Sequence, residues 1–259
     1  MNVIFIGGKQ IGVNCLKVLL ENDIHPSIVI GNRDDHGLDF EWHESVIKVA
    51  QENKLTVEQK KLSDKTLQEH IKSINPTIIF CIGSTQIIPA EILSIPQLGS
   101  INIHPALLPK YRGRFSTAHA IFNGEKETGV TLQWMDEGID TGPIILQEKI
   151  TIEEYDTAKT LYEKFTTTGT HLFKQFLSLL LSQQYLPKIS QDENQATYYP
   201  KGLPNKGEID WQWSGKKIKN FIRAMTFEPF DPPFFYLGNK KMIIVEEKLY
   251  LKREHHENN

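Results

Sequence analysis

Short apolar runs alternate with helical patterns along the first part of the chain. Residues 3–6 form a continuous apolar run that ends at Gly7 and Gly8, which predicts a strand followed by a tight turn. Helical spacing follows, with apolar positions at Ile11, Cys15, Val18 and Leu19. Two more strands are predicted in the same way at residues 28–30 and 77–82, and two more helices at residues 46–50 and 67–74. This alternation is typical of a parallel sheet with helices on both faces.

The pattern continues with a strand that stops at a proline. Residues 101–104 form this strand, and Pro105 ends it because proline has no N–H to donate to a sheet. Asp156 or Thr157 is a candidate N-cap for a long helix, whose apolar face carries Leu161, Phe165, Leu172, Phe176 and Leu180. Two strand-like runs precede this helix, at residues 130–134 and 144–150.

Polar, turn-rich sequence in residues 183–208 separates a second unit from this pattern. That unit is predicted to contain a helix and a hairpin, from apolar segments at residues 209–213, 218–225 and 234–245. We therefore predict an α/β fold with a Rossmann-like, mostly parallel sheet in an N-terminal domain of residues 1–183. Residues 184–259 form a linker and a small C-terminal α+β subdomain with a β-hairpin, and we expect a frayed tail from residue 252.

Length and charge limit the classes of protein. With 259 residues, 39% of them apolar, the chain can build one large core and a small appendage. Its net charge is -3, without the cationic face of nucleic-acid-binding proteins, which favours a small anionic substrate. We find no signal pattern and no apolar run of about 20 residues, and expect a cytoplasmic protein without a membrane span. The two cysteines and the scattered histidines form no ligand-like set, so we expect no metal site.

Three polar residues are candidates for chemistry. Asn102 and His104 are two positions apart on a strand, so their side chains share one face, at the strand's carboxyl end. Open α/β sheets bind ligands at that edge. Asp140 lies in the polar loop between the next two strands. The three can converge on one reacting carbon, although a polar pair before Pro105 can equally cap the strand exit, and spacing alone leaves both readings open.

Ordered motifs carry a family resemblance. The Asn102-x-His104-Pro105 run is followed by residues 107–113 (LLPKYRG), 128–131 (TGVT) and 135–143 (MDEGIDTGP). In this order the chain resembles the 10-formyltetrahydrofolate-dependent formyltransferases, strongly over residues 75–150 and in outline over residues 1–245. Within that family it most resembles the sugar N-formyltransferases that act on nucleotide-linked amino sugars, such as the dTDP-4-amino-4,6-dideoxyglucose formyltransferases.

The resemblance implies catalytic roles for Asn102, His104 and Asp140. Formyl transfer to an amine passes through a tetrahedral carbon with an oxyanion, which requires hydrogen-bond donors and a group that manages the amine proton. Asn102 would donate to the oxyanion, and His104 would donate to it or carry the proton. Asp140 would orient the imidazole and favour its charged form.

The resemblance also implies a co-substrate, N10-formyltetrahydrofolate. Its site would be built largely from the backbone of two loops, with contacts from Gln86, Ile87, Ile88, Asp136, Gly138 and Ile139. Arg114 corresponds to a position that contacts folate in near relatives. From the residues alone, residues 86–88 are equally an ordinary loop before a helix at Pro89, and Arg114 is equally a solvated charge.

The acceptor site is less clearly marked. The glycine pattern after the first strand is G-G-x-x-x-G and not the G-x-G-x-x-G of dinucleotide-binding turns, which argues against a bound dinucleotide. We predict that Lys9 contacts a nucleotide diphosphate, with a solvated lysine as the alternative. Tyr199, Trp211 and Arg223 are candidates for binding the base and phosphates, although aromatic residues of a small subdomain usually form its core.

We therefore predict a cytoplasmic homodimeric enzyme that formylates a nucleotide-linked amino-dideoxy sugar, with dTDP-4-amino-4,6-dideoxyglucose preferred, for surface polysaccharide (O-antigen, lipopolysaccharide) synthesis. Its partners would be folate and a nucleotide sugar, with no nucleic acid or membrane. A UDP-4-amino-arabinose or methionyl-tRNA formyltransferase is the alternative within the family. A formyltetrahydrofolate hydrolase or a folate-binding protein is the alternative from other classes.

Overall fold

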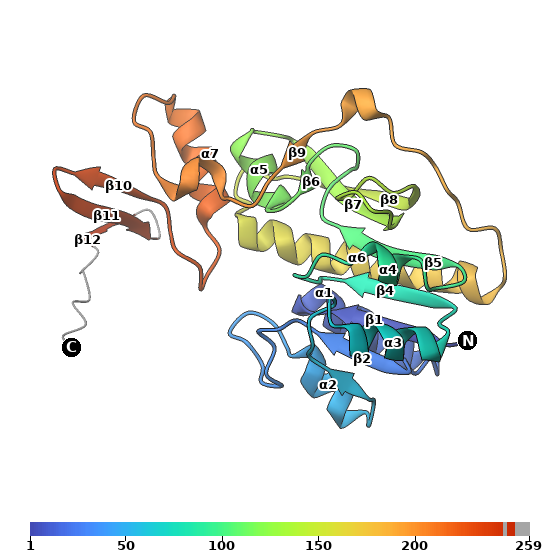
Figure 1. The fold of residues 1–259 in the computed structure, drawn as a ribbon. Helices are drawn as coiled ribbons and strands as arrows, with labels where there is room; N and C mark the ends of the chain where they lie inside the picture. Colours follow the sequence, from blue (N-terminus) through green and yellow to red (C-terminus); the bar gives the residue numbers. More distant parts are fainter. Residues whose placement is uncertain (246–247, 252–259) are drawn as a thin grey trace, which may run out of the picture.

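A seven-stranded sheet forms the centre of the computed structural model, which describes residues 1–245 and 248–251 (Figure 1). Its strands are β1 (Val3–Gly7), β2 (Ile28–Gly31), β3 (Val57–Glu58), β4 (Ile78–Ile82), β5 (Gly99–His104), β7 (Glu127–Trp134) and β8 (Ile144–Thr151). The spatial order is β3-β2-β1-β4-β5-β7-β8. The first five strands in this order are parallel, whereas β7 is antiparallel to both β5 and β8. The predicted mostly parallel sheet is confirmed.

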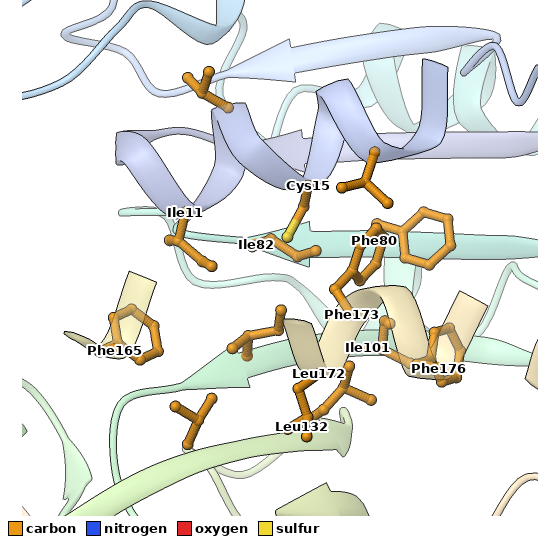
Figure 2. Packing of buried hydrophobic residues seen from close by; sticks show 14 of the residues in the cluster. Ile11, Cys15, Phe80, Ile82, Ile101, Leu132, Phe165, Leu172, Phe173 and Phe176 are labelled. Atoms are coloured by element: carbon orange, nitrogen blue, oxygen red, sulfur yellow. The ribbon is translucent and has the colours of Figure 1, made fainter. Parts of the chain in front are cut away.

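Helices cover both faces of this sheet. They are α1 (Lys9–Glu21), α2 (Val46–Glu52), α3 (Lys65–Ile74), α4 (Ala90–Leu93), α5 (Ser116–Phe122) and α6 (Ala158–Leu181). On one face, Phe80 of β4 packs edge-on against Phe173 of α6 at 5.3 Å, and Ile11 and Cys15 of α1 belong to the same apolar cluster (Figure 2). On the other face, Ile4 and Ile6 of β1 form a second cluster, with Leu67 and Ile71 of α3 and Ile92 of α4. Because the strands are buried on both faces, their sequences are continuously apolar.

The long helix begins where the sequence predicts. The Thr157 hydroxyl accepts a hydrogen bond from the backbone N–H of Thr160, and the Thr160 hydroxyl accepts one from the backbone N–H of Thr157. This reciprocal arrangement satisfies two donors that the first turn of a helix leaves unpaired.

A small C-terminal unit has its own core. It contains α7 (Gly215–Met225) and an antiparallel sheet of β10 (Phe234–Leu237), β11 (Lys240–Val245) and β12 (Lys248–Leu251). The apolar core residues are Ile209, Phe221, Met225, Phe235, Met242 and Ile244. The helix begins at Gly215, earlier than the apolar pattern indicates, because the Ser214 hydroxyl caps it. The predicted helix and hairpin are confirmed, and β12 is an additional strand. The frayed tail expected from residue 252 lies outside the described residues.

The chain between α6 and α7 returns across the main domain (Figure 1, orange). Ile189 and Ile144, the first residue of β8, exchange backbone hydrogen bonds of 2.8 and 3.0 Å. Further along, β9 (Tyr198–Tyr199) pairs in parallel with β6 (Arg112–Gly113). Two 3₁₀ helices complete this part, η1 (Glu193–Gln195) and η2 (Pro204–Gly207). None of the helices in the described part of the chain has the length and apolar character needed to cross a membrane.

Candidate active site

Asn102 and His104 point away from the main core. Their neighbours on β5, Ile101 and Ile103, belong to the cluster under α1 and α6. Because successive side chains of a strand alternate between faces, Asn102 and His104 share the opposite face. His104 is buried and Asn102 is partly buried.

Asp140 meets both residues from the loop between β7 and β8. Its Oδ2 lies 3.3 Å from Nδ1 of His104, and its Oδ1 accepts a hydrogen bond of 3.4 Å from Nδ2 of Asn102. The backbone of Asp140 has φ of 56°, a left-handed conformation that Asp and Asn tolerate better than most residues. The structure therefore brings the three predicted catalytic side chains together.

Two further donors hold the Asp140 carboxylate. The backbone N–H of Gly113 donates to Oδ2 at 2.9 Å, and Nε2 of Gln133 donates to Oδ1 at 3.0 Å. Gln133 is buried and lies directly opposite Asn102 in the antiparallel register of β5 and β7. Sequence reasoning missed Gln133, because its place depends on that register, which the sequence pattern does not fix.

His104 is held from its other side by the loop after β5. Its Nε2 lies 2.7 Å from the carbonyl oxygen of Tyr111. The Thr131 hydroxyl, opposite His104 on β7, donates to the carbonyl of Ala106 at 2.6 Å and accepts from the N–H of Leu108 at 3.1 Å. The strand exit is thus fixed, and each ring nitrogen of His104 faces an oxygen atom.

The loop after β4 and the loop after β7, both predicted to bind folate, are linked by packing. Ile88 is buried in the same apolar cluster as Met135, whereas Ile87 is 76% exposed. Gln86 accepts a hydrogen bond from the N–H of Leu62 at 3.2 Å, but its buried Nε2 has no partner within residues 1–245 and 248–251. A buried amide donor without a partner suits a ligand that offers an acceptor, as the pterin of a folate does.

The second predicted folate segment is a tight turn. Oδ1 of Asp136 accepts from the N–H of Gly138 at 3.0 Å and from the Thr141 hydroxyl at 2.6 Å. This closes the turn and leaves the Ile139 side chain 46% exposed. Arg114 is exposed as well, and its backbone N–H pairs with the carbonyl of Tyr199.

Lys9 is a cation without a direct partner among the described residues. It is partly buried, and its φ of 59° places it in the left-handed region at the first position of α1. Burial lowers the pKa of Lys9, the nearby charge of Arg114 lowers it further, and Asp34 acts in the opposite direction. Two cations therefore lie within electrostatic reach of each other at this edge of the sheet.

The remaining predicted acceptor residues are engaged in contacts within the protein, and only Tyr199 lies near the catalytic candidates. Tyr199 stacks on Tyr111, with ring centroids 5.2 Å apart, and Trp211 is 57% exposed, with its ring against Phe235. The guanidinium of Arg223 donates to the carbonyls of Glu153 and Asp156, at 3.0 and 2.8 Å, and to the Asn220 side chain. No contact in the described residues joins Trp211 or Arg223 to Asp140, and their roles stay predictions.

A hollow of about 250 Å³ lies beside the first part of α1, where Gln10 and Asn14 line it. Its lining residues are Gln10, Asn14, Trp42, Lys159, Tyr162, Glu163, Thr166, Thr167 and Phe227. Trp42 makes edge contacts with Phe227 and Tyr162, at 5.3 and 5.7 Å between ring centroids. Sequence reasoning missed Trp42, because it lies in a polar segment without helical or strand periodicity.

Comparison with known proteins identifies the family of this chain. A family model described as "Formyl transferase" matches residues 1–177, and one described as "Formyl transferase, C-terminal domain" matches residues 203–258. The chain belongs to the formyl transferase family. This membership confirms the predicted enzyme class and N10-formyltetrahydrofolate as the family's formyl donor. The domain boundary at residue 183 stays a prediction.

The names of the relatives within the formyl transferase family indicate different functions. The chain is 37% identical over 230 residues to the methionyl-tRNA formyltransferase of Caldanaerobacter subterraneus subsp. tengcongensis, covering 87% of this chain and 74% of that protein. It is 36% identical over 250 residues to the bifunctional polymyxin resistance protein ArnA of Wigglesworthia glossinidia brevipalpis, covering 96% of this chain but only 38% of that protein.

A solved structure of the family covers nearly the whole chain. It is an N-formyltransferase from Helicobacter canadensis in complex with folinic acid and dTDP-3-aminofucose. It aligns with a TM-score of 0.77 and 27% identity, over 94% of this chain and 95% of that chain. The Rossmann-like formyltransferase fold with a small C-terminal unit is thereby confirmed.

Proposed function

We propose that this formyltransferase moves the formyl group of N10-formyltetrahydrofolate to the amino group of a dideoxy sugar carried on a nucleoside diphosphate. The preferred acceptor is dTDP-4-amino-4,6-dideoxyglucose, and the product serves surface polysaccharide synthesis in the cytoplasm. The observation that carries this proposal is the convergence of Asn102, His104 and Asp140, with the cations Lys9 and Arg114 at the same sheet edge.

The geometry supports a direct transfer between the two substrates. The sugar amine attacks the formyl carbon, a C–N bond forms, and the bond from that carbon to N10 of the folate breaks. Asn102 donates to the oxyanion of the tetrahedral intermediate. The proton that the amine loses passes to the His104–Asp140 pair, whose Nδ1 and Oδ2 lie 3.3 Å apart, and the pair returns it to N10 as tetrahydrofolate leaves. Asp140 orients the imidazole throughout.

The folate lies against the loops that follow β4 and β7. Gln86 offers its unpartnered amide, and Ile87 and Ile139 offer exposed apolar surface to the planar pterin ring. Asp136 and Gly138 shape the turn that presents Ile139. Arg114 is exposed and can meet the anionic glutamate end of the folate or the acceptor's phosphates.

The nucleotide lies at the edge where Lys9 begins α1. Lys9 binds the diphosphate, which supplies the direct ion-pair partner that the lysine lacks among the described residues, where Asp34 acts on it only at longer range. The hollow lined by Gln10, the residue after Lys9, and walled by Trp42 and Phe227 is large enough for a nucleobase and offers aromatic surface for stacking. Tyr199, Trp211 and Arg223 remain the alternative set, and a homodimer remains part of the proposal.

Charge around Lys9 disfavours a tRNA acceptor. Residues 32–45 contain five acidic residues and one basic residue, and the chain as a whole has a net charge of -3. His43 of this segment lies within electrostatic reach of Lys9. A nucleic acid would require a surplus of cations to neutralise its phosphates, whereas a single diphosphate requires only one or two.

A mass-spectrometric assay tests the proposal. The protein is incubated with N10-formyltetrahydrofolate and a panel of dTDP- and UDP-linked 3-amino and 4-amino sugars, with a control that lacks sugar. Gain of one formyl group by the dTDP-linked 4-amino sugar is the expected result. Formyl release without any sugar indicates a hydrolase, folate binding without turnover indicates a binding protein, and formylation of methionyl-tRNA alone refutes the sugar acceptor.

A further inference from the structure

The segment that follows α6 contacts the backbone of the Asp140 turn. Nε2 of Gln191 donates to the carbonyl of Asp140 at 2.9 Å and to the carbonyl of Gly142 at 2.7 Å. Gln191 is 51 residues from Asp140 in the chain. A left-handed residue such as Asp140 keeps its conformation only where surrounding contacts hold it. Gln191 provides two such contacts on the backbone side of the turn.

A buried guanidinium fixes the orientation of this amide. Nε and Nη2 of Arg112 donate to Oε1 of Gln191 at 3.1 and 2.8 Å, and Nη1 and Nη2 donate to the two carboxylate oxygens of Glu193 at 2.8 and 2.6 Å. Arg112 is buried, whereas the Glu193 side chain is 69% exposed. A flipped Gln191 amide would set its NH₂ against the arginine donors and its oxygen against two carbonyls, so only one orientation satisfies all partners.

The same segment also supports His104. The hydroxyl of Thr197 accepts from the backbone N–H of Tyr111 at 2.8 Å, and the backbone N–H of Arg112 donates to the carbonyl of Thr197 at 2.9 Å. Tyr111 is the residue whose carbonyl faces Nε2 of His104. His104 of β5 and Asp140 of the β7–β8 loop are thus both supported by contacts from the segment 191–197.

We propose that Gln191, oriented by the Arg112–Glu193 pair, is a positioning residue that holds the Asp140 turn for formyl transfer. Gln191 touches neither substrate in this arrangement and acts through Asp140. The inference rests on the proposed function in so far as Asp140 is catalytic. It assigns a role in the chemistry to Gln191, which sequence reasoning placed in a polar, turn-rich linker and did not name as a site residue.

Gln191→Ala tests this role, with Gln195→Ala as the matched control. Gln195 is an exposed glutamine of the same segment whose side chain hydrogen-bonds only Asp192 among the described residues. We expect Gln191→Ala to lower kcat by about 10- to 100-fold, as misplacement of a reacting group does, with both KM values within about two-fold of wild type. Gln195→Ala should keep wild-type kcat. A wild-type kcat for Gln191→Ala overturns the proposal.

A double-mutant cycle separates positioning from a general structural role. In an Asp140→Asn background, Gln191→Ala should change kcat by less than about two-fold, because the group it positions is already disabled. An equal loss in both backgrounds overturns the proposal. Glu193→Gln, which keeps one acceptor for Arg112, serves as the second variant in the same cycle if Gln191→Ala folds poorly.

Hydrogen exchange provides a test that needs no acceptor. We expect amides of residues 134–143 to exchange faster in Gln191→Ala than in wild type or Gln195→Ala. If Gln191→Ala leaves the exchange of these amides unchanged, the proposed positioning role of Gln191 is overturned, even where sugar formylation is established. If exchange is faster in Gln191→Ala but the wild type formylates no sugar, the contact between Gln191 and the Asp140 turn is supported and only the sugar acceptor is refuted.

Discussion

Asp140→Asn isolates the charge of the carboxylate to which we assign a catalytic role. Asn tolerates φ of 56° about as well as Asp, so the turn keeps its backbone, whereas Ala would add strain. In the wild type, Oδ2 of the carboxylate accepts from the Gly113 N–H and faces His104. Its Oδ1 accepts from Gln133 and Asn102. The Asn side chain has only one oxygen and cannot fill both places. The Gly113 N–H is fixed in the backbone, so we expect the oxygen to turn toward it and the NH₂ to face Gln133.

The expected losses differ for activity and stability. Removing one well-placed electrostatic group typically lowers kcat about 100- to 1000-fold. One buried hydrogen bond to a charge contributes about 1.5–3 kcal/mol, which lowers Tm by several degrees in a protein of this size. Quenched-flow or discontinuous mass-spectrometric turnover gives kcat, and thermal unfolding gives Tm. Turnover of a folded Asp140→Asn protein within about ten-fold of wild type would refute the role assigned to the carboxylate.

Three further predictions concern the acceptor site and the core. Lys9→Ala should raise the KM for the nucleotide sugar about ten-fold or more, since a charge-assisted hydrogen bond contributes about 1.5–3 kcal/mol; an unchanged KM contradicts the diphosphate contact. Burial lowers the pKa of Lys9, and only the charged form of the lysine attracts a diphosphate. The KM for the nucleotide sugar should therefore rise as the pH increases through that lowered pKa. Lys9→Arg stays charged and should show no such rise in KM. Trp42→Ala should raise the same KM with the folate KM unchanged, and an equal effect on both argues against a base site. Phe173→Ala should destabilise the protein by about 3–5 kcal/mol in urea unfolding, and a loss below about 1 kcal/mol would contradict its full burial.

Local patterns predict those parts of the fold that depend on local physics. The apolar runs at β1, β2 and β4 and the cap at Thr157 could be read directly, because burial on both faces and helix capping each leave a signature in neighbouring residues. The two-residue strands β3, β6 and β9 could not, because so short a strand has no periodicity. Their pairing follows from long-range packing.

The same distinction applies to the site. Asn102, His104 and Asp140 lie within one ordered set of motifs, and their convergence could be expected from strand alternation and the resemblance. Gln133 and Gln191 could not, because one depends on the register of an antiparallel pair and the other on a segment that returns from beyond α6. Lone glutamines in polar sequence resemble ordinary surface residues until their partners are known.

The two outer strands of the sheet affect how copies of this protein can meet. A free strand edge is a template for pairing with another chain, which leads to aggregation unless the edge is short, charged or covered. At one side β3 is only two residues long. At the other, β8 carries exposed Lys149, paired with Glu127, and its first residue is already paired with Ile189 of the returning segment. Continuous extension of the seven-stranded sheet from one protomer to the next is therefore disfavoured.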